Sequence, residues 1–303
     1  MKNSIRAMLA MIAILPCALF FTACGGEKIT AEQANEAFAA AITETGNVST
    51  DYKIELNAKI SGNYEGQSIS ANAKGTFVKT GEAVKNEADG TYNIDAVKVG
   101  LSVESTSKLA NVESKMNFNY SAGKVGDKFV LVDNSNKDNK VYQDIGEMAQ
   151  ALFGLNISEL LTEIMGIAGS DTELPIPDIT EIDFSNLALE SETMKLDAVK
   201  TGDKDFKLTF NGYEIDADMA MKLDGKFTLV IKNGKFASLS ANFTMYTPDM
   251  ANITETTDFT DASIYKTKMI SLDGSIKMTY GAQKVSLPSS LTGYTETTVI
   301  PTM

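Results

Sequence analysis

The chain is poor in the side chains that perform most enzyme chemistry. Its 303 residues include no histidine and no tryptophan, and its one arginine is Arg6. Without histidine there is no imidazole for a catalytic triad, a proton shuttle or a typical zinc site. Without a later arginine there is no guanidinium for bidentate binding of phosphate or carboxylate. The composition therefore predicts a protein that is not an enzyme and uses no metal or cofactor.

Positive charge and cysteine are also scarce. The chain has 27 basic and 40 acidic residues, a net charge of −13, and only the cysteines Cys17 and Cys24. Affinity for nucleic acid depends on neutralising backbone phosphates, so a strongly acidic chain is not expected to bind it. Prolines are few, and no Pro-rich, Ser-rich or charged linker divides the chain, which favours a single domain over residues 31–303.

The N-terminus has the order of a secretion signal. Lys2 and Arg6 form a short positive region, residues 7–21 are almost entirely apolar, and small residues follow up to Gly26. A transmembrane helix is the alternative interpretation. The apolar run has 15 residues and contains Pro16, whereas a membrane span needs about 20. We therefore predict a signal peptide over residues 1–23.

Thr22 and Ala23 stand before Cys24, and Phe21 takes the place usually held by leucine. The segment resembles the bacterial lipobox, in which the cysteine receives a diacylglyceryl group and the signal is cleaved before it. The resemblance implies that Cys24 is the lipidated N-terminus. Two acyl chains on this residue would be enough for stable anchoring. Residues 24–30 would be a short tether of at most about 20 Å. The protein is then expected outside the cytoplasm, on the outer face of the cytoplasmic membrane.

Two segments have the spacing of helices. The first starts after Thr30, a good N-cap, with Gln33 completing a capping box and Gly46 ending it. Its apolar face is formed by Ala34, Ala37, Phe38, Ala41 and Ile42. The second, residues 147–168, is richly apolar and is split near Gly154 and Asn156. We predict an N-terminal helix and a central helical insertion.

Most of the remaining chain alternates apolar and polar residues, which gives a strand one buried and one solvated face. The alternation occurs in residues 52–60, 69–73, 116–120, 206–210, 215–221, 227–231, 239–245 and 276–280. Asx-Gly pairs are strong signals for hairpin turns. They occur at Asp89-Gly90, Asn211-Gly212, Asp224-Gly225, Asn233-Gly234 and Asp273-Gly274. Together these patterns predict about ten to twelve antiparallel strands.

A sheet of this size has more apolar surface than two helices can cover. Eleven strands make a sheet roughly 50 Å wide, and each helix is about 10 Å across. The remaining apolar surface must curl on itself, meet a partner or enclose an apolar ligand. We therefore predict a mainly β (α+β) protein in which a large curved antiparallel sheet, a half-barrel, holds the N-terminal helix and the helical insertion in its concave face.

Four segments carry a resemblance to a known group. They are the helix start at residues 30–33, the first strand at 51–56, a central hairpin at 229–236, and the closing residues 285–288. The chain resembles the half-β-barrel lipoproteins of bacterial envelopes, which include LolA/LolB-like carriers, LppX/LprG-like lipid binders and related Firmicutes lipoproteins. The resemblance implies binding of lipids or other hydrophobic molecules. No functional residue except Cys24 can be carried over by motif.

The sequence leaves two hypotheses open. One is a membrane-anchored binding protein for a lipid or another hydrophobic small molecule, held in an apolar cavity. The other is a structural lipoprotein, or one that binds an envelope protein partner, whose concavity is filled by its own helices. An apolar pocket above about 300 Å³ would favour the first. The residues predicted to line the pocket are Leu152, Phe153, Leu160, Leu161, Ile164 and Met165.

Overall fold

The computed structural model describes residues 26–297 with internal gaps. The gaps are residues 47–50, 65–66, 83, 87, 89–91, 110–111, 136–137, 139, 154–155, 157–192, 250 and 252. In the described residues, two α-helices lie between strands: α2 (Ala31–Gly46) and α3 (Ile145–Phe153). A short 3-10 helix, η3 (Ala262–Ile264), lies before the last long strand.

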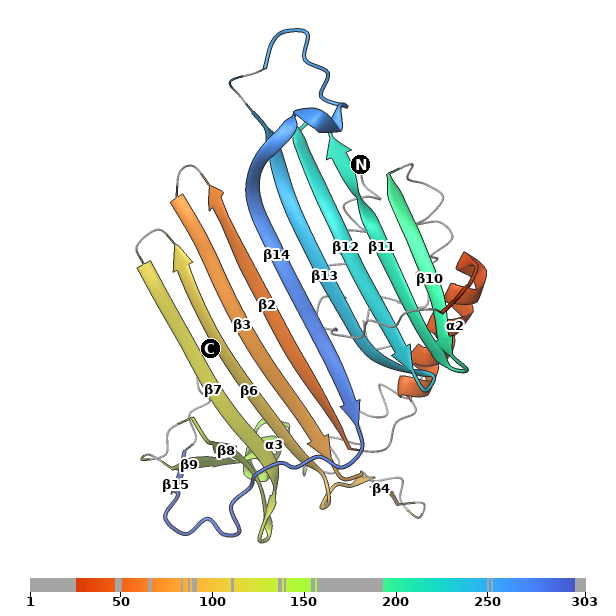
Figure 1. The fold of residues 1–303 in the computed structure, drawn as a ribbon. Helices are drawn as coiled ribbons and strands as arrows, with labels where there is room; N and C mark the ends of the chain where they lie inside the picture. Colours follow the sequence, from red (N-terminus) through yellow and green to blue (C-terminus); the bar gives the residue numbers. More distant parts are fainter. Residues whose placement is uncertain are drawn as a thin grey trace.

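Thirteen strands form one curved sheet in the order β1-β10-β11-β12-β13-β14-β2-β3-β6-β7-β8-β9-β15 (Figure 1). The long strands are β2 (Tyr52–Tyr64), β3 (Gln67–Thr80), β6 (Lys98–Leu109), β7 (Val112–Val125), β10 (Met194–Gly202), β11 (Asp205–Asp216), β12 (Met221–Lys232), β13 (Lys235–Pro248) and β14 (Tyr265–Tyr280). The predicted half-barrel of antiparallel strands is confirmed.

Short strands complete the edges of the sheet. They are β1 (Glu27–Lys28), β8 (Lys128–Asp133), β9 (Val141–Asp144) and β15 (Thr295–Glu296). The pairing of β15 with β9 is parallel, while the other pairings in the sheet are antiparallel. A separate pair joins β4 (Val84–Lys85) to β5 (Tyr92–Asn93). Because β1 pairs with β10, residues expected to be free tether belong to the sheet.

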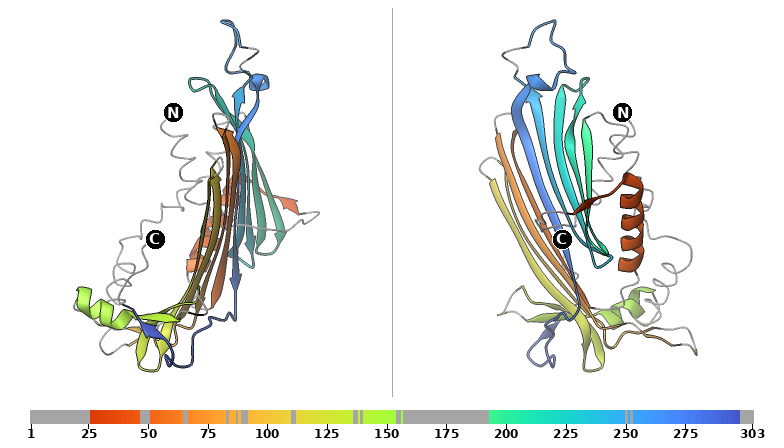
Figure 2. Two further views of the ribbon diagram at one scale, coloured as in Figure 1. Left: turned by 90° about the vertical axis from the view of Figure 1, so that its left-hand side faces the viewer. Right: turned by 45° about the vertical axis from the view of Figure 1, so that its right-hand side comes forward.

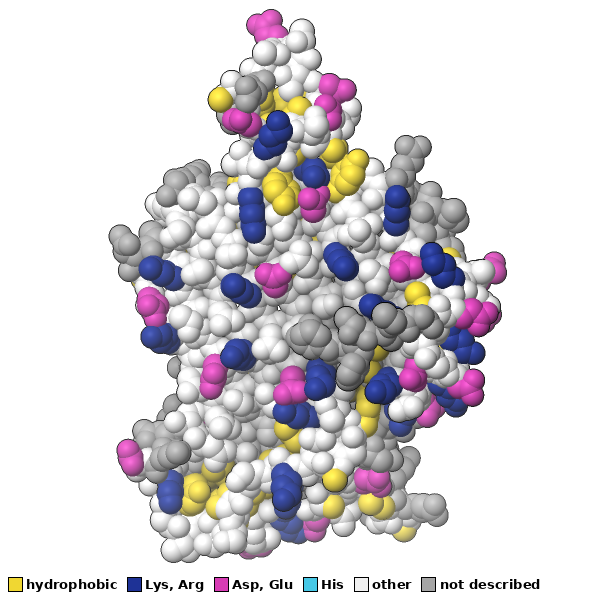
Figure 3. All heavy atoms as spheres, viewed as in Figure 1, with side chains coloured by type: hydrophobic (Ala, Val, Ile, Leu, Met, Phe, Trp, Pro, Cys, Tyr) yellow, Lys and Arg dark blue, Asp and Glu magenta, His cyan; other side chains and the backbone are white. Residues whose placement is uncertain are grey.

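The alternation of the sequence gives the sheet two different faces. One row of directly opposed residues is Leu208, Leu229, Leu239, Ile276 and Leu56. The next row, one residue further along each strand, is Thr209, Thr228, Ser240, Ser275 and Asn57. Figure 2 shows the sheet bending toward the side that carries α2 and α3. We call this apolar side the concave face. The polar side is the convex face, where Figure 3 shows scattered charges.

The N-terminal helix begins as its sequence predicts. The Thr30 N–H donates to Gln33 Oε1 at 2.9 Å, and the Gln33 N–H donates to Thr30 Oγ1 at 3.2 Å. This is the reciprocal capping box. Ala34, Phe38 and Ala41 are buried against the concave face of β10 to β13. Small alanine side chains let the helix axis approach the sheet closely, so α2 covers the core of β10 to β13.

Three of the predicted Asx-Gly turns are wrong. Asn211-Gly212, Asp224-Gly225 and Asp273-Gly274 lie inside β11, β12 and β14. At Gly225 an added Cβ would lie 3.0 Å from the Phe243 ring on the next strand, so glycine makes room for an aromatic neighbour. A turn signal in the sequence cannot distinguish this packing role from a hairpin.

Asn233-Gly234 is a turn, as predicted. Both residues have positive φ, 53° and 72°, between β12 and β13. Two consecutive positive φ values are what a type I′ hairpin turn requires. Asp89-Gly90 lies outside the described residues.

The predicted strand over residues 215–221 is also wrong. The chain turns there: β11 ends at Asp216, residues 217–220 form the turn, and β12 begins at Met221. The Met219 N–H donates to Asp216 Oδ1 at 2.9 Å, and Ala220 has a φ of 49°. An aspartate that bonds to the backbone in this way mimics a turn and ends the strand.

The row of apolar residues on the concave face predicts a large loss of stability on truncation. Leu208 is 0% exposed and belongs to the core under α2. Leu208→Ala should lower the free energy of unfolding by about 2–5 kcal/mol, since it leaves a cavity in packed surroundings. The measurement is urea unfolding. Asn211→Ala, an exposed position on the convex face of the same strand, should change stability by about 0.5 kcal/mol or less. Equal losses in both would contradict the assignment of faces.

Candidate functional site

The part of the concave face away from α2 carries exposed apolar side chains. Leu101, Leu109, Val112 and Met116 are 39%, 56%, 73% and 49% exposed. Register places them on one face of β6 and β7, where Leu109 lies opposite Val112 and Leu101 lies opposite Tyr120. They are four of the six large apolar side chains that are exposed in the described part of the chain. Leu109 and Val112 face each other, and Met116 and Leu101 lie further along the same face. Exposed apolar residues that share one face mark a binding surface more often than scattered ones do.

The predicted pocket residues cannot be compared with this surface. Leu160, Leu161, Ile164 and Met165 lie outside the described residues, as does the predicted anchor Cys24. Leu152 and Phe153 are the last residues of α3, and their side chains lie outside the described part. The pocket composition therefore stays a prediction.

The described residues before and after residues 157–192 belong to distant parts of the sheet. Helix α3 ends at Phe153 and contacts β8, near one edge. The chain is described again from Thr193, and Met194 starts β10 near the opposite edge. In the strand order, eight strands separate β8 from β10, so these two described ends lie near opposite edges of the sheet.

A pocket of about 470 Å³ lies at the seam between α2 and the sheet. Its apolar lining includes Ile29, Ala37 and Phe206, and its charged lining includes Glu36 and Lys204. A lining that combines apolar and charged side chains suits an amphiphilic molecule better than a purely polar one.

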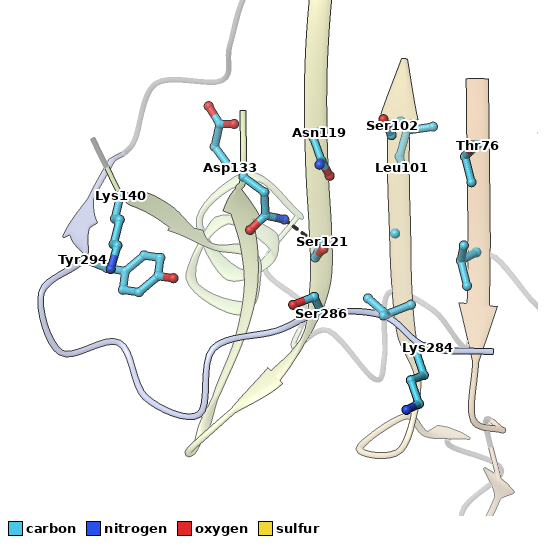
Figure 4. A pocket seen from close by; sticks show the side chains of 14 residues that line it. Thr76, Leu101, Ser102, Asn119, Ser121, Asp133, Lys140, Lys284, Ser286 and Tyr294 are labelled. Carbon is cyan, nitrogen blue, oxygen red and sulfur yellow. Dashed lines mark hydrogen bonds between the residues drawn. The ribbon is translucent and has the colours of Figure 1, made fainter. Parts of the chain in front are cut away.

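A second pocket, of about 690 Å³, lies on the convex face (Figure 4). Thr76, Ser102, Asn119 and Ser121 supply hydroxyl and amide groups from β3, β6 and β7. Figure 4 shows the C-terminal segment crossing in front of these strands with Ser286 toward the pocket. The sequence did not predict this pocket, because it is formed by residues that are distant along the chain. Its lining mixes these polar groups with apolar residues such as Val78 and Val285, so it is not the apolar cavity that the sequence led us to expect.

The segment that closes this pocket, residues 281–296, is called the C-terminal strap. At its start the Gly281 N–H donates to the Asp51 carbonyl at 2.9 Å. In its middle, Leu287 and Leu291 pack on a core that includes Val130 and Tyr142. At its end β15 pairs with β9. The strap is therefore attached to Asp51, the residue before β2, to the second core and to β9.

One lysine connects the end of the strap to α3. The Lys128 ammonium nitrogen lies 3.0 Å from Asp144 Oδ2, 3.5 Å from Glu147 Oε1 and 3.4 Å from Glu296 Oε2. Asp144 is buried, and its other oxygen accepts the Glu147 N–H at 3.0 Å, capping α3. We call Lys128, Asp144, Glu147 and Glu296 the Lys128 cluster.

Electrostatics hold this cluster together. The hydrogen bond to Asp144 raises the pKa of Lys128 well above its ordinary value. The Tyr142 hydroxyl donates to Glu296 Oε2 at 2.5 Å, and this bond raises the pKa of Tyr142. The three carboxylates could converge on a metal ion by distance alone. The ammonium group of Lys128 already lies among their oxygens, so we assign the cluster as an ion-pair junction.

The Lys128 cluster predicts how the end of the strap responds to mutation and to pH. Both raised pKa values mean that the folded protein holds these protons more tightly than the unfolded chain. The resulting stability is present below about pH 10 and is lost as the pH rises further. Lys128→Met should expose the amides of Thr295 and Thr297 to faster hydrogen exchange at neutral pH and should weaken the alkaline dependence of unfolding.

The matched control is Lys124→Met, which removes a more exposed ion pair with Asp95. It should leave the exchange of the two strap amides unchanged. Unchanged exchange in Lys128→Met, or equally fast exchange in both variants, would show that the cluster does not hold the strap.

Neither helix in the described ranges is long and apolar enough to cross a membrane. No protein-family model matches the chain. A comparison with curated proteins also gives no match. Among solved structures, the chain is similar to a porin-like protein from Bacteroides uniformis, with 8% identity, 76% of this chain and 96% of that chain covered, and a TM-score of 0.17. At this TM-score the likeness supports no argument about fold or function.

Proposed function

We propose that this protein is a membrane-anchored envelope lipoprotein that binds a lipid or another hydrophobic molecule on its concave face. The observation that carries the proposal is the exposed apolar surface of β6 and β7, which continues the buried apolar face under α2. Apolar surface of this kind is favourable to cover and costs free energy while it faces water. A hydrophobic ligand lying along the sheet would remove that cost.

The position of the first strand supports delivery from a membrane. Glu27 pairs with Lys200 on β10, and the Ile29 N–H donates to the Ala198 carbonyl at 3.0 Å. If Cys24 is lipidated, only residues 25 and 26 separate it from β1, which is about 10 Å at full extension. The β10 edge of the sheet would then lie close to the lipid headgroups, beside the seam pocket of α2.

The alternative function is a structural or protein-binding lipoprotein whose concave face is covered by its own chain. The connection between α3 and β10 is the part of the chain that would have to supply this cover. Native mass spectrometry of the full chain, released from membranes in mild detergent, separates the two functions. A retained lipid or other apolar molecule supports the carrier, and a bare chain supports the alternative.

Anchoring is tested at Cys24. Cys24→Ala should abolish incorporation of a radiolabelled fatty acid and should move the protein from the membrane fraction to the soluble fraction. Two acyl chains hold a protein firmly to a bilayer, and their loss leaves no comparable anchor. Cys17→Ala is the control, because Cys17 lies within the predicted signal and should not matter. Labelling that persists in Cys24→Ala would refute the anchor.

Ligand binding is tested by two neighbouring positions on β6 that face opposite ways. The strand register places Leu101 beside Phe77, on the concave face, and Ser102 between Thr76 and Asn119, on the convex face. Leu101→Asp should weaken binding of a hydrophobic fluorescent probe about tenfold, because a carboxylate is costly to desolvate in an apolar site. Ser102→Asp should leave the affinity unchanged. If the parent protein does not bind the probe, or if both variants behave alike, the concave face is not the binding surface.

A further inference from the structure

Among the described residues, half of one long strand has no partner strand on one of its sides. Strand β7 runs over Val112–Val125, but β8 pairs only with its second half, from Tyr120 onward. Just before that pairing, the Asn119 N–H donates to Ser135 Oγ at 2.8 Å and the Asn119 carbonyl accepts the Asn134 N–H at 2.7 Å. In the described part of the chain, no strand pairs with β7 on this side between Val112 and Phe118.

The direction of the unpaired backbone groups follows from Asn119. In an antiparallel pair, residues alternate between bonding to one neighbour and bonding to the other. The pairing of β6 with β7 runs from Leu109–Val112 to Lys98–Gly123 without a register shift. Because Asn119 points its backbone groups away from β6, Asn117, Lys115 and Glu113 point theirs the same way. Their N–H and carbonyl groups form a regular template for another strand.

The side chains along this edge do not block such pairing. Many proteins protect an exposed edge with lysine charges. Here Lys115 Nζ lies 2.7 Å from Glu113 Oε1, so the two charges compensate each other. On the opposite face of the same segment, Val112 and Met116 are among the exposed apolar residues. The edge thus combines unpaired backbone groups, balanced charge and apolar side chains.

We propose that β7 pairs antiparallel with β7 of a second copy of this chain, about a two-fold axis at Ser114. In this register Glu113 lies opposite Lys115 of the second copy, and symmetry repeats the pair. On the concave face, Val112 lies opposite Met116 of the second copy, also twice. Opposite charges and apolar pairs in directly facing positions both stabilise adjacent strands.

Neighbouring registers are less favourable. An axis at Glu113 or at Lys115 places that residue opposite itself, so that like charges face each other. An axis at Met116 places Glu113 opposite Asn119, whose outward backbone groups are already bonded to residues 134 and 135. The charge pattern of the edge and the occupied backbone groups of Asn119 together favour the axis at Ser114.

Such a dimer joins two concave faces into one apolar surface that crosses the two-fold axis. The paired segment is short, which places the contact among weak associations in dilute solution. Its formation depends on backbone groups and on the β7 edge, and it does not require that the concave face binds a ligand. The dimer and the proposed function can therefore be tested separately.

Cross-linking tests the register directly. In the proposed pairing Ser114 faces Ser114 of the second copy at a non-hydrogen-bonded position, where Cα atoms are about 4.5 Å apart. A disulfide bridges Cα atoms about 4.4–6.8 Å apart. Ser114→Cys in the full chain, oxidised mildly in its membranes, should therefore form a covalent dimer that disappears on reduction.

The control for this experiment is Ser107→Cys. Ser107 lies opposite Ser114 on β6, is exposed, and shares its face. It is one strand further from the axis on each side, so its symmetry mate is about 14 Å away, beyond the reach of a disulfide. Absence of a Ser114→Cys dimer, or equal cross-linking of both variants and the parent, would overturn the proposal.

Charge reversal tests the same register without a covalent bond. Lys115→Glu and Glu113→Lys each create like-charged pairs across the axis and should weaken self-association severalfold in sedimentation velocity. The double variant Glu113→Lys/Lys115→Glu restores opposite charges and should recover the parent association. Thermal unfolding checks that all three fold. Recovery that fails in a folded double variant, or single variants that associate like the parent, would show that this edge pairing is not formed.

Discussion

The pairing of β14 with β2 is the constraint on which the rest of the structure depends. The first and last long strands of the chain pair there. The pairing runs along β2 from Tyr52 to Gly62. Ile276 lies opposite Leu56 on the concave face, and Lys277 lies opposite Glu55 on the convex face. Each half of the protein is a meander of neighbouring strands, and this contact joins the two meanders into one sheet. Such a pairing of distant segments carries a large loop-closure cost and is expected to form late in folding.

Joining the meanders also creates the imbalance from which the functional proposal starts. The meander of β10 to β14 receives α2, whose alanines and Phe38 bury its apolar side chains. The meander of β2 to β7 has the same alternation, but its outer strands keep Leu109 and Val112 exposed. The apolar face therefore extends across the pairing of β14 with β2. Among the described residues, helix α2 covers it only on the half formed by β10 to β14. In the proposed function a ligand covers the other half, and in the alternative a protein surface does so.

Sequence reasoning predicted features that depend on a local pattern. It failed where the conformation of a residue depends on a neighbouring strand. Period-two alternation identified most long strands, and the capping box at Thr30 was found because both partners lie within one turn. Gly225 was misread as a turn because its reason is the Phe243 ring on another strand. The Lys128 cluster brings Glu296 beside Asp144, two residues with no relation along the chain. No spacing rule predicts such a contact before the topology is known.

The free edge of β7 and the apolar concave face arise from the same architecture but involve different atoms. A single curved layer has two ends, and an end that no strand covers leaves backbone groups unpaired. At the other edge, β1 pairs with Val199 and Lys200 of β10 and shortens the open stretch. At the β7 edge, Ser135 and Asn134 satisfy only Asn119 before the strand continues into solvent. The two edges therefore differ. The β10 edge, nearest the predicted anchor, is partly covered by β1, whereas the first half of β7 has backbone groups that another strand could pair with.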